Sequence, residues 1–196
     1  MSISLNLKKG MSLDLTKHDN ELHILNIGLG WQTEYDLDSI AFCVNENDKI
    51  VETVCYQNLN GKGVELDGDD TRGGKSGDCE TITIDFSKVP SNINKIMLCA
   101  NIFNATPSRI KKSFFGKKET IEEGDTFSRV KGSYIRLYNA ETNVELCKYS
   151  LEEDGSQFNA FHFADLIKNS NGDWNFEAIG IGMNGSILEL RKQLDK

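Results

Sequence analysis

The stretch Thr81–Phe103 reads TITIDFSKVPSNINKIMLCANIF, and it contains two different strand patterns. Its first part, Thr81–Phe86, alternates β-branched apolar and polar side chains, which is typical of a half-buried strand. Its last part, Lys95–Phe103, is an almost continuous apolar run, which predicts a strand buried on both faces. Strands of these two kinds, separated by turn residues, favour a layered β architecture.

Short strands recur on both sides of this stretch. The 17 Gly and only two Pro of the chain favour many tight turns between them. Apolar or alternating segments predict strands at Leu22–Leu29, Ile40–Val44, Val51–Tyr56, Ser133–Tyr138, Val144–Tyr149 and Trp174–Ile181, with Ser133–Tyr138 and Val144–Tyr149 forming a hairpin. Helical spacing of apolar residues indicates short helices around 159–169 and 186–194. We therefore predict a mainly β fold, a two-sheet β-sandwich with one or two short helices.

The 196 residues are expected to form a single domain, residues 1–196. The segment 106–123 has no clear periodicity, so we interpret it as a mobile surface insertion loop. A basic patch for an acidic partner, with Phe114 and Phe115 as its apolar anchor, is the alternative.

The formal net charge is −8, which argues against general nucleic-acid binding. No apolar run approaches the roughly 20 residues of a spanning helix, and the N-terminus lacks a signal-peptide pattern. We expect a cytoplasmic protein that does not itself span a membrane. The five scattered cysteines, without any Cys-x-x-Cys pair, are expected to be buried apolar residues.

The segment 66–80 reads LDGDDTRGGKSGDCE, and we call it the acidic loop. Its carboxylates are Asp67, Asp69, Asp70, Asp78 and Glu80. Like charges about 4 Å apart repel by ~4 kcal/mol near a protein surface, so crowded carboxylates need solvent or a cation between them. Glycines let the backbone turn carbonyl oxygens inward, and Ca²⁺ accepts irregular shells of about 6–8 oxygens. The loop is therefore a candidate calcium site, with a solvated acidic turn as the alternative.

A second acidic cluster precedes the strand at Ile40. Asp36 and Asp38 are two residues apart, so their side chains point the same way in an extended chain. Asn58 adds a neutral oxygen close in sequence to the acidic loop.

The acidic loop resembles one nucleotide-binding pattern and one calcium-binding pattern, but it matches neither. Gly74-Lys75-Ser76 resembles the end of a phosphate loop, but Asp69 replaces the first glycine and a strand follows. An EF-hand frame from Asp69 to Glu80 has Thr71 at a ligand position and lacks flanking helices. No signature of a catalytic triad, a zinc protease or a dinucleotide fold occurs, so we predict that the protein is not an enzyme.

Taken together, several segments resemble the TerD family of tellurium-resistance and stress-response proteins. The segments that carry the resemblance are Leu7–Gly10, Leu15–Lys17, Gly28–Trp31, Tyr35–Ser39, Tyr56–Asn58, Gly68–Glu80, Val89–Pro90, Ser133–Arg136 and Trp174–Gly180. The match to the family pattern runs nearly end to end.

This resemblance implies a calcium-binding β-sandwich without established catalysis, in a tellurite or chemical-stress resistance system. Its partners would be calcium ions and related resistance-cluster proteins, including membrane components. The ligands that it implies, shared between two adjacent ions, are Asp36, Asp38, Asn58, Asp69, Asp70, Asp78 and Glu80. The order Thr71-Arg72, the pair Gly74-Lys75 and Cys79 depart from the family pattern and remove carboxylates.

Two other functions stay open. Calcium could bridge to a nucleotide, a sugar or a lipid head group, with Trp31, Tyr35 and Tyr56 as aromatic neighbours. A metal-dependent hydrolase would use Asp36 or Asp38 to orient a metal-bound water.

Overall fold

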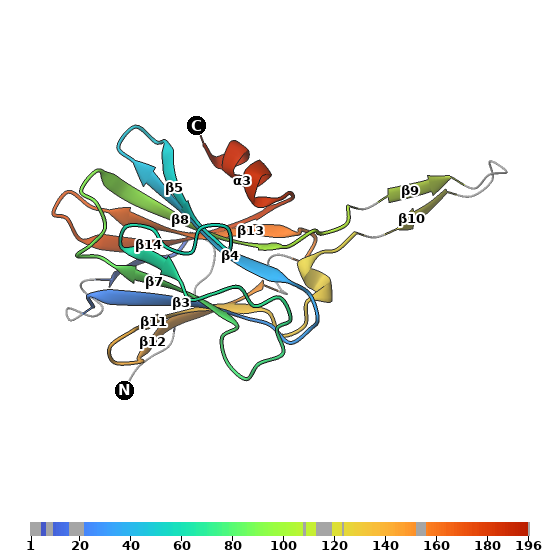
Figure 1. Ribbon diagram of the computed structural model, residues 1–196, viewed down its shortest axis with the longest axis horizontal. Helices are drawn as coiled ribbons and strands as arrows, with labels where there is room; N and C mark the ends of the chain where they lie inside the picture. Colours follow the sequence, from blue (N-terminus) through green and yellow to red (C-terminus); the bar gives the residue numbers. More distant parts are fainter. Residues whose placement is uncertain are drawn as a thin grey trace.

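The computed structural model of the chain describes residues 5–6, 10–15, 22–107, 109–112, 119–122, 124–151 and 156–195. Its strands form two six-stranded sheets that lie face to face, and a two-stranded ribbon projects from one end (Figure 1). The predicted two-sheet β-sandwich is confirmed.

The first sheet has the order β1-β12-β11-β3-β7-β6. All its neighbours pair antiparallel except β1 and β12, which are parallel. The hairpin predicted over Ser133–Tyr149 is present as β11 and β12. The bounds in sheet order are β1 (Leu5–Asn6), β12 (Glu145–Ser150), β11 (Tyr134–Asn139), β3 (Ile24–Gly30), β7 (Glu80–Asp85) and β6 (Val64–Leu66).

The second sheet is fully antiparallel and has the order β2-β14-β13-β8-β4-β5. Its central strand β8 contains the apolar run that predicted a strand buried on both faces. The bounds are β2 (Ser12–Asp14), β14 (Trp174–Met183), β13 (Ala160–Lys168), β8 (Ile93–Ile102), β4 (Leu37–Asn45) and β5 (Ile50–Val54).

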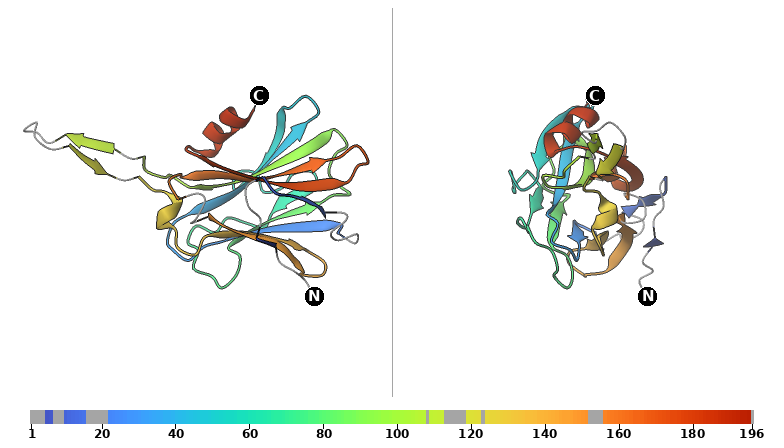
Figure 2. Two further views of the ribbon diagram at one scale, coloured as in Figure 1. Left: turned by 180° about the vertical axis from the view of Figure 1, so that it is seen from behind. Right: turned by 90° about the vertical axis from the view of Figure 1, so that its right-hand side faces the viewer.

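Both faces of the second sheet are covered, which explains why most residues of its middle strands are buried. In β4, Ala41 and Cys43 contribute to the core between the sheets, whereas Ile40 and Phe42 belong to a second apolar cluster. That second cluster includes Leu190 of helix α3 (Ile187–Leu194), which lies over the outer face of the sheet (Figures 1 and 2). The helix predicted at 186–194 is therefore present, and a Ser186–Glu189 capping box begins it.

The helix predicted around 159–169 is wrong, because Ala160–Lys168 is strand β13 between β8 and β14. The pairing register shifts between His162 and Ala164 in both ladders, which is a β-bulge. A bulge interrupts the two-residue alternation of a strand. The apolar spacing of Phe161, Leu166 and Ile167 consequently resembled that of an amphipathic helix.

The segment 106–123, which we interpreted as a loop, contains two short strands. They are β9 (Arg109–Lys112) and β10 (Glu119–Glu122), and they pair antiparallel in a ribbon that extends away from both sheets (Figures 1 and 2). A 3-10 turn, η1 (Phe127–Arg129), follows the ribbon. Phe114 and Phe115 lie outside the described residues.

All five cysteines are buried and free, as predicted. Within the described part of the chain, no helix is both long and apolar enough to cross a membrane.

Candidate metal centre

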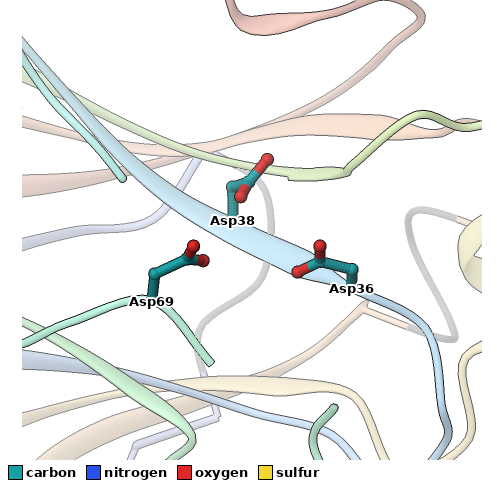
Figure 3. A group of neighbouring side chains, drawn as sticks. All are labelled: Asp36, Asp38 and Asp69. Atoms are coloured by element: carbon teal, nitrogen blue, oxygen red, sulfur yellow. The ribbon is translucent and has the colours of Figure 1, made fainter. Parts of the chain in front are cut away.

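Three carboxylates from two segments meet at one end of the sandwich. Asp36 immediately precedes β4, Asp38 lies in β4, and Asp69 belongs to the acidic loop between β6 and β7 (Figure 3). One carboxylate oxygen from each of the three lies within 4.8 Å of the other two. We call this group the acidic triad.

Asp38 is the most enclosed member of the acidic triad. Its exposed fraction is 2%. Its Oδ2 is buried and accepts no hydrogen bond from the described residues, and the same holds for Oδ1 of Asp36. Burying a polar atom without a partner costs about 1–3 kcal/mol, and more for a charged group. These two oxygens are therefore available to a ligand of the protein.

Burial and mutual repulsion favour the protonated forms of these acids. Burial, reinforced by the charges of Asp36 and Asp69, raises the pKa of Asp38 from 3.8 to about 7, while a hydrogen bond from Asn101 opposes the shift. Burial and the charges of Asp69 and Asp70 also raise the pKa of Asp36. At neutral pH, a positive charge in the site would therefore stabilise the ionised forms of these acids.

The acidic loop is held in place by contacts that do not use the triad. The Glu80 side chain is fully buried and accepts hydrogen bonds from the backbone N–H of Ser39 at 2.7 Å and of Asp70 at 3.3 Å. It thereby joins the loop to β4. Burial, with Asp38 as a further cause, raises the pKa of Glu80 to about 8. At the neck of the loop, Asp67 exchanges hydrogen bonds with the backbone of Thr81.

A tryptophan supports the far side of the acidic loop. The backbone N–H of Gly74 donates to the carbonyl of Trp31, and the Trp31 indole donates to the carbonyl of Tyr35. A Cβ at Gly73, where φ is +59°, would lie 2.1 Å from the Trp31 Nε1 atom. Only glycine permits this approach, which sets the loop against the strand that ends at Gly30.

Four residues of the ligand set implied by resemblance have other partners in the structure. Asp70 accepts from the N–H groups of Arg72 and Gly73 and forms an ion pair with Lys75. The side-chain amide of Asn58 donates to the carbonyl of Thr53, and Asn58 is exposed. The remaining two are Glu80, described above, and Asp78.

Asp78 forms a paired ionic contact on the first sheet. It receives three hydrogen bonds from the Arg136 guanidinium, two of them at 2.8 Å and one at 3.0 Å, and a fourth from the Tyr134 hydroxyl at 3.0 Å. Its side chain is only 7% exposed. A guanidinium therefore already neutralises the Asp78 carboxylate.

Sequence reasoning missed Asn101, which hydrogen-bonds Asp38 and is itself buried. The available signal was a single amide inside the apolar run Lys95–Phe103, since a buried polar side chain needs a partner.

The donor set of the acidic triad fits a hard divalent cation. All three residues offer carboxylate oxygens, and no described histidine or cysteine belongs to the group. Oxygen ligands suit Ca²⁺ and Mg²⁺, whereas softer transition metals prefer nitrogen or sulfur. The irregular arrangement from one strand and one loop suits Ca²⁺, because Mg²⁺ demands a near-octahedral shell.

Comparison with known proteins shows what the chain is similar to. The family model described as "TerD domain" matches residues 1–194. The chain is 32% identical to the general stress protein 16U of Bacillus subtilis (strain 168), over 96% of this chain and 95% of that protein. It is 30% identical to the tellurium resistance protein TerD of Serratia marcescens, over 97% of both chains.

A crystal structure shares the fold. It is that of a homologue of telluride resistance protein from Streptomyces coelicolor A3(2), with a TM-score of 0.66 and 17% identity, covering 87% of this chain and 95% of the other.

Proposed function

Because the chain belongs to the TerD domain family of tellurium-resistance and stress-response proteins, we propose that it is a calcium-binding protein in which Asp36, Asp38 and Asp69 hold the ion. The observation that carries this proposal is Oδ2 of Asp38, a buried carboxylate oxygen without a partner among the described residues. A divalent ion supplies the positive charge that this group lacks.

The chain's own residues explain what such an ion would do. Asp36 and Asp38 are fixed by β4, and the backbone N–H of Phe103 additionally anchors the carbonyl of Asp36. Asp69 lies at the exposed part of the acidic loop. An ion shared by the three carboxylates therefore fastens the acidic loop to the second sheet, in addition to the Glu80 contact.

One ion per chain is the stoichiometry that the acidic triad supports. The two adjacent ions implied by resemblance would also need Asp70, Asp78 and Asn58, which have protein partners. Calorimetric titration of metal-stripped protein with Ca²⁺ measures this number directly. Two equivalent binding events would contradict the assignment.

The proposed cellular role is non-enzymatic and cytoplasmic, within a tellurite or chemical-stress resistance system. The names of the stress and tellurium-resistance relatives support this role. The proposed partners are calcium and related resistance-cluster proteins, including membrane components. A hydrolase stays the weaker alternative, because the charged neighbours of Asp36 and Asp38 are further carboxylates and the sequence contains no hydrolase signature.

Calcium is expected to raise the melting temperature of the metal-stripped protein. A ligand that binds only the folded state stabilises it by about 2.7 kcal/mol at a hundredfold excess over Kd. For a chain of this size the shift is about 5–10 °C. Differential scanning calorimetry measures it, with Mg²⁺ as the matched control ion. An equal shift with Mg²⁺ would contradict the selectivity, and no shift with Ca²⁺ would contradict the proposal.

The metal-stripped protein is expected to lose stability as the pH rises. Burial raises the pKa of Asp38 to about 7 and that of Glu80 to about 8, whereas both acids ionise near pH 4 in an unfolded chain. Between these values the folded protein binds protons that the unfolded chain has lost. The contribution of each protonated group to the free energy of unfolding is therefore complete below about pH 4. It falls by ~1.4 kcal/mol per pH unit for each group and is lost by about pH 8.

Urea unfolding of metal-stripped protein across this pH range tests that sign. Asp38→Asn is the matched control, because it removes one of the two groups and should flatten the curve. A free energy of unfolding that increases from acidic to neutral pH would show that these carboxyls are not held protonated.

A further inference from the structure

A pocket of about 580 Å³ adjoins the acidic triad. Its lining includes Asp38 in β4, the end of β8 with the segment that follows it, Asn159 before β13, Asn184 after β14 and the start of α3. Volumes of about 300–1,000 Å³ are usual for small-molecule sites. The residues on which the argument depends are Asp38, Tyr56, Asn101, Phe103, Asn159 and Asn184.

Three lining asparagines leave hydrogen-bonding groups for a ligand. Oδ1 of Asn101 is buried and has no partner among the described residues, although the residue is only 2% exposed. Asn159 and Asn184 use their side-chain oxygens to accept from the N–H groups of Gly185 and Asn159, respectively. Their amide NH₂ groups make no hydrogen bond within the described part of the chain. The pocket therefore offers one acceptor and two amide donors.

The charges of the lining exclude a simple anion site. No lysine or arginine occurs among the described lining residues, and the two charged ones are Asp38 and Glu189. Glu189 already accepts hydrogen bonds from the N–H and the hydroxyl of Ser186, which occupies the N-terminus of α3. With an ion bound at Asp38, a phosphate or carboxylate in the pocket would still meet the Glu189 carboxylate and no cationic side chain among the described lining residues, so a neutral ligand fits better.

An aromatic pair gives the pocket an apolar surface. The rings of Tyr56 and Phe103 are 5.4 Å apart in an edge-to-face arrangement, and both residues are half-buried. Aromatic faces pack against C–H groups, while the asparagines bind hydroxyls. Neutral polyols and sugars present both kinds of surface.

We propose that this pocket binds a small neutral polyhydroxylated molecule, a sugar or a polyol, next to the ion site. The coupling to calcium rests on the proposed function, because Asp38 belongs to both sites and Asn101 hydrogen-bonds Asp38 while lining the pocket. An ion at the acidic triad fixes Asp38, and through it Asn101, so calcium pre-organises the pocket.

The test is a chemical-shift titration of the full chain with D-mannose, D-ribose and myo-inositol, with calcium and after metal stripping. For a ligand of about twelve non-hydrogen atoms, a millimolar Kd is expected for at least one probe. Removal of calcium should weaken that binding about fivefold or more. Tyr56→Leu, which removes a ring, and Asn184→Asp, which replaces an amide donor by an acceptor, should each weaken it about tenfold.

Asn171→Asp is the matched control for charge. Asn171 is exposed in the turn between β13 and β14, at the opposite end of these strands from Asn159 and Asn184. This variant should bind the probe within about twofold of the parent chain. Far-ultraviolet circular dichroism of each variant shows whether its fold is retained.

The outcomes separate this inference from the calcium proposal. Calcium binding without binding of any of the three probes would overturn the pocket assignment alone. Probe binding that depends on Tyr56 and Asn184, without calcium binding, would retain the pocket and overturn both the ion site and the coupling. Tighter binding of ribose 5-phosphate than of ribose would overturn the neutral ligand class.

Discussion

Asp38→Asn is expected to destabilise the protein in calcium and to stabilise it after metal stripping. With calcium at about a ten-thousandfold excess over Kd, the variant lacks the most buried carboxylate of the acidic triad and so loses the ion's stabilisation of about 5.5 kcal/mol, which exceeds the gain that the substitution brings without metal. Without metal above neutral pH, the same substitution removes a buried charge that faces Asp36 and Asp69. A pKa raised from 3.8 to about 7 corresponds to a gain on the order of 2–4 kcal/mol at such pH.

This reversal of sign distinguishes an ion site from an acidic turn in solvent. Urea unfolding at pH 8 measures four free energies of unfolding, those of the parent chain and of the Asp38→Asn variant, each with calcium and after metal stripping. Asp67→Asn is the matched control, because it also removes one negative charge, here from the acidic loop. The asparagine retains an oxygen that can accept from the N–H of Thr81. A substitution at Asp38 that lowers stability equally under both conditions would indicate a structural carboxylate, and calcium would then bind elsewhere.

The layered fold was predictable because strand patterns are local. Alternation in Thr81–Phe86 and the apolar run of Lys95–Phe103 correspond to β7 and β8 within a few residues. The helix proposed around 159–169 was wrong because of the bulge between His162 and Ala164, which is not a local feature of the sequence. No pattern along one chain segment reveals a register shift that depends on two neighbouring strands.

The candidate site was predictable in composition and less so in geometry. The two-residue spacing of Asp36 and Asp38 indicated side chains on one face, and the structure places them beside Asp69. The acidic loop, however, contains five carboxylates, and their uses depend on distant partners. Arg136 and the backbone of β4 lie near Asp78 and Glu80 only after the sheets have formed, so sequence spacing does not separate a cation ligand from an ion-pair partner.

Asp78→Asn is expected to lower the free energy of unfolding by about 2–4 kcal/mol, both with calcium and after metal stripping. The substitution leaves the Arg136 guanidinium half-buried without the carboxylate that accepts its two short hydrogen bonds. It also removes the charge that the Tyr134 hydroxyl contacts. Because Asp78 does not belong to the acidic triad, the calcium Kd should change by less than about threefold.

A double-mutant cycle with Arg136→Gln identifies the interaction that is lost. If Asp78 serves mainly to pair with Arg136, the double variant should be less destabilised than the sum of the two single variants, with a coupling of about 1–3 kcal/mol. Additive losses would show that the two side chains act independently. The ligand role that family resemblance implies for Asp78 predicts the opposite pattern, in which metal-stripped stability is unchanged and calcium binding is lost. Measuring both quantities on the same variant therefore decides whether this aspartate binds the ion or supports the sheet behind it.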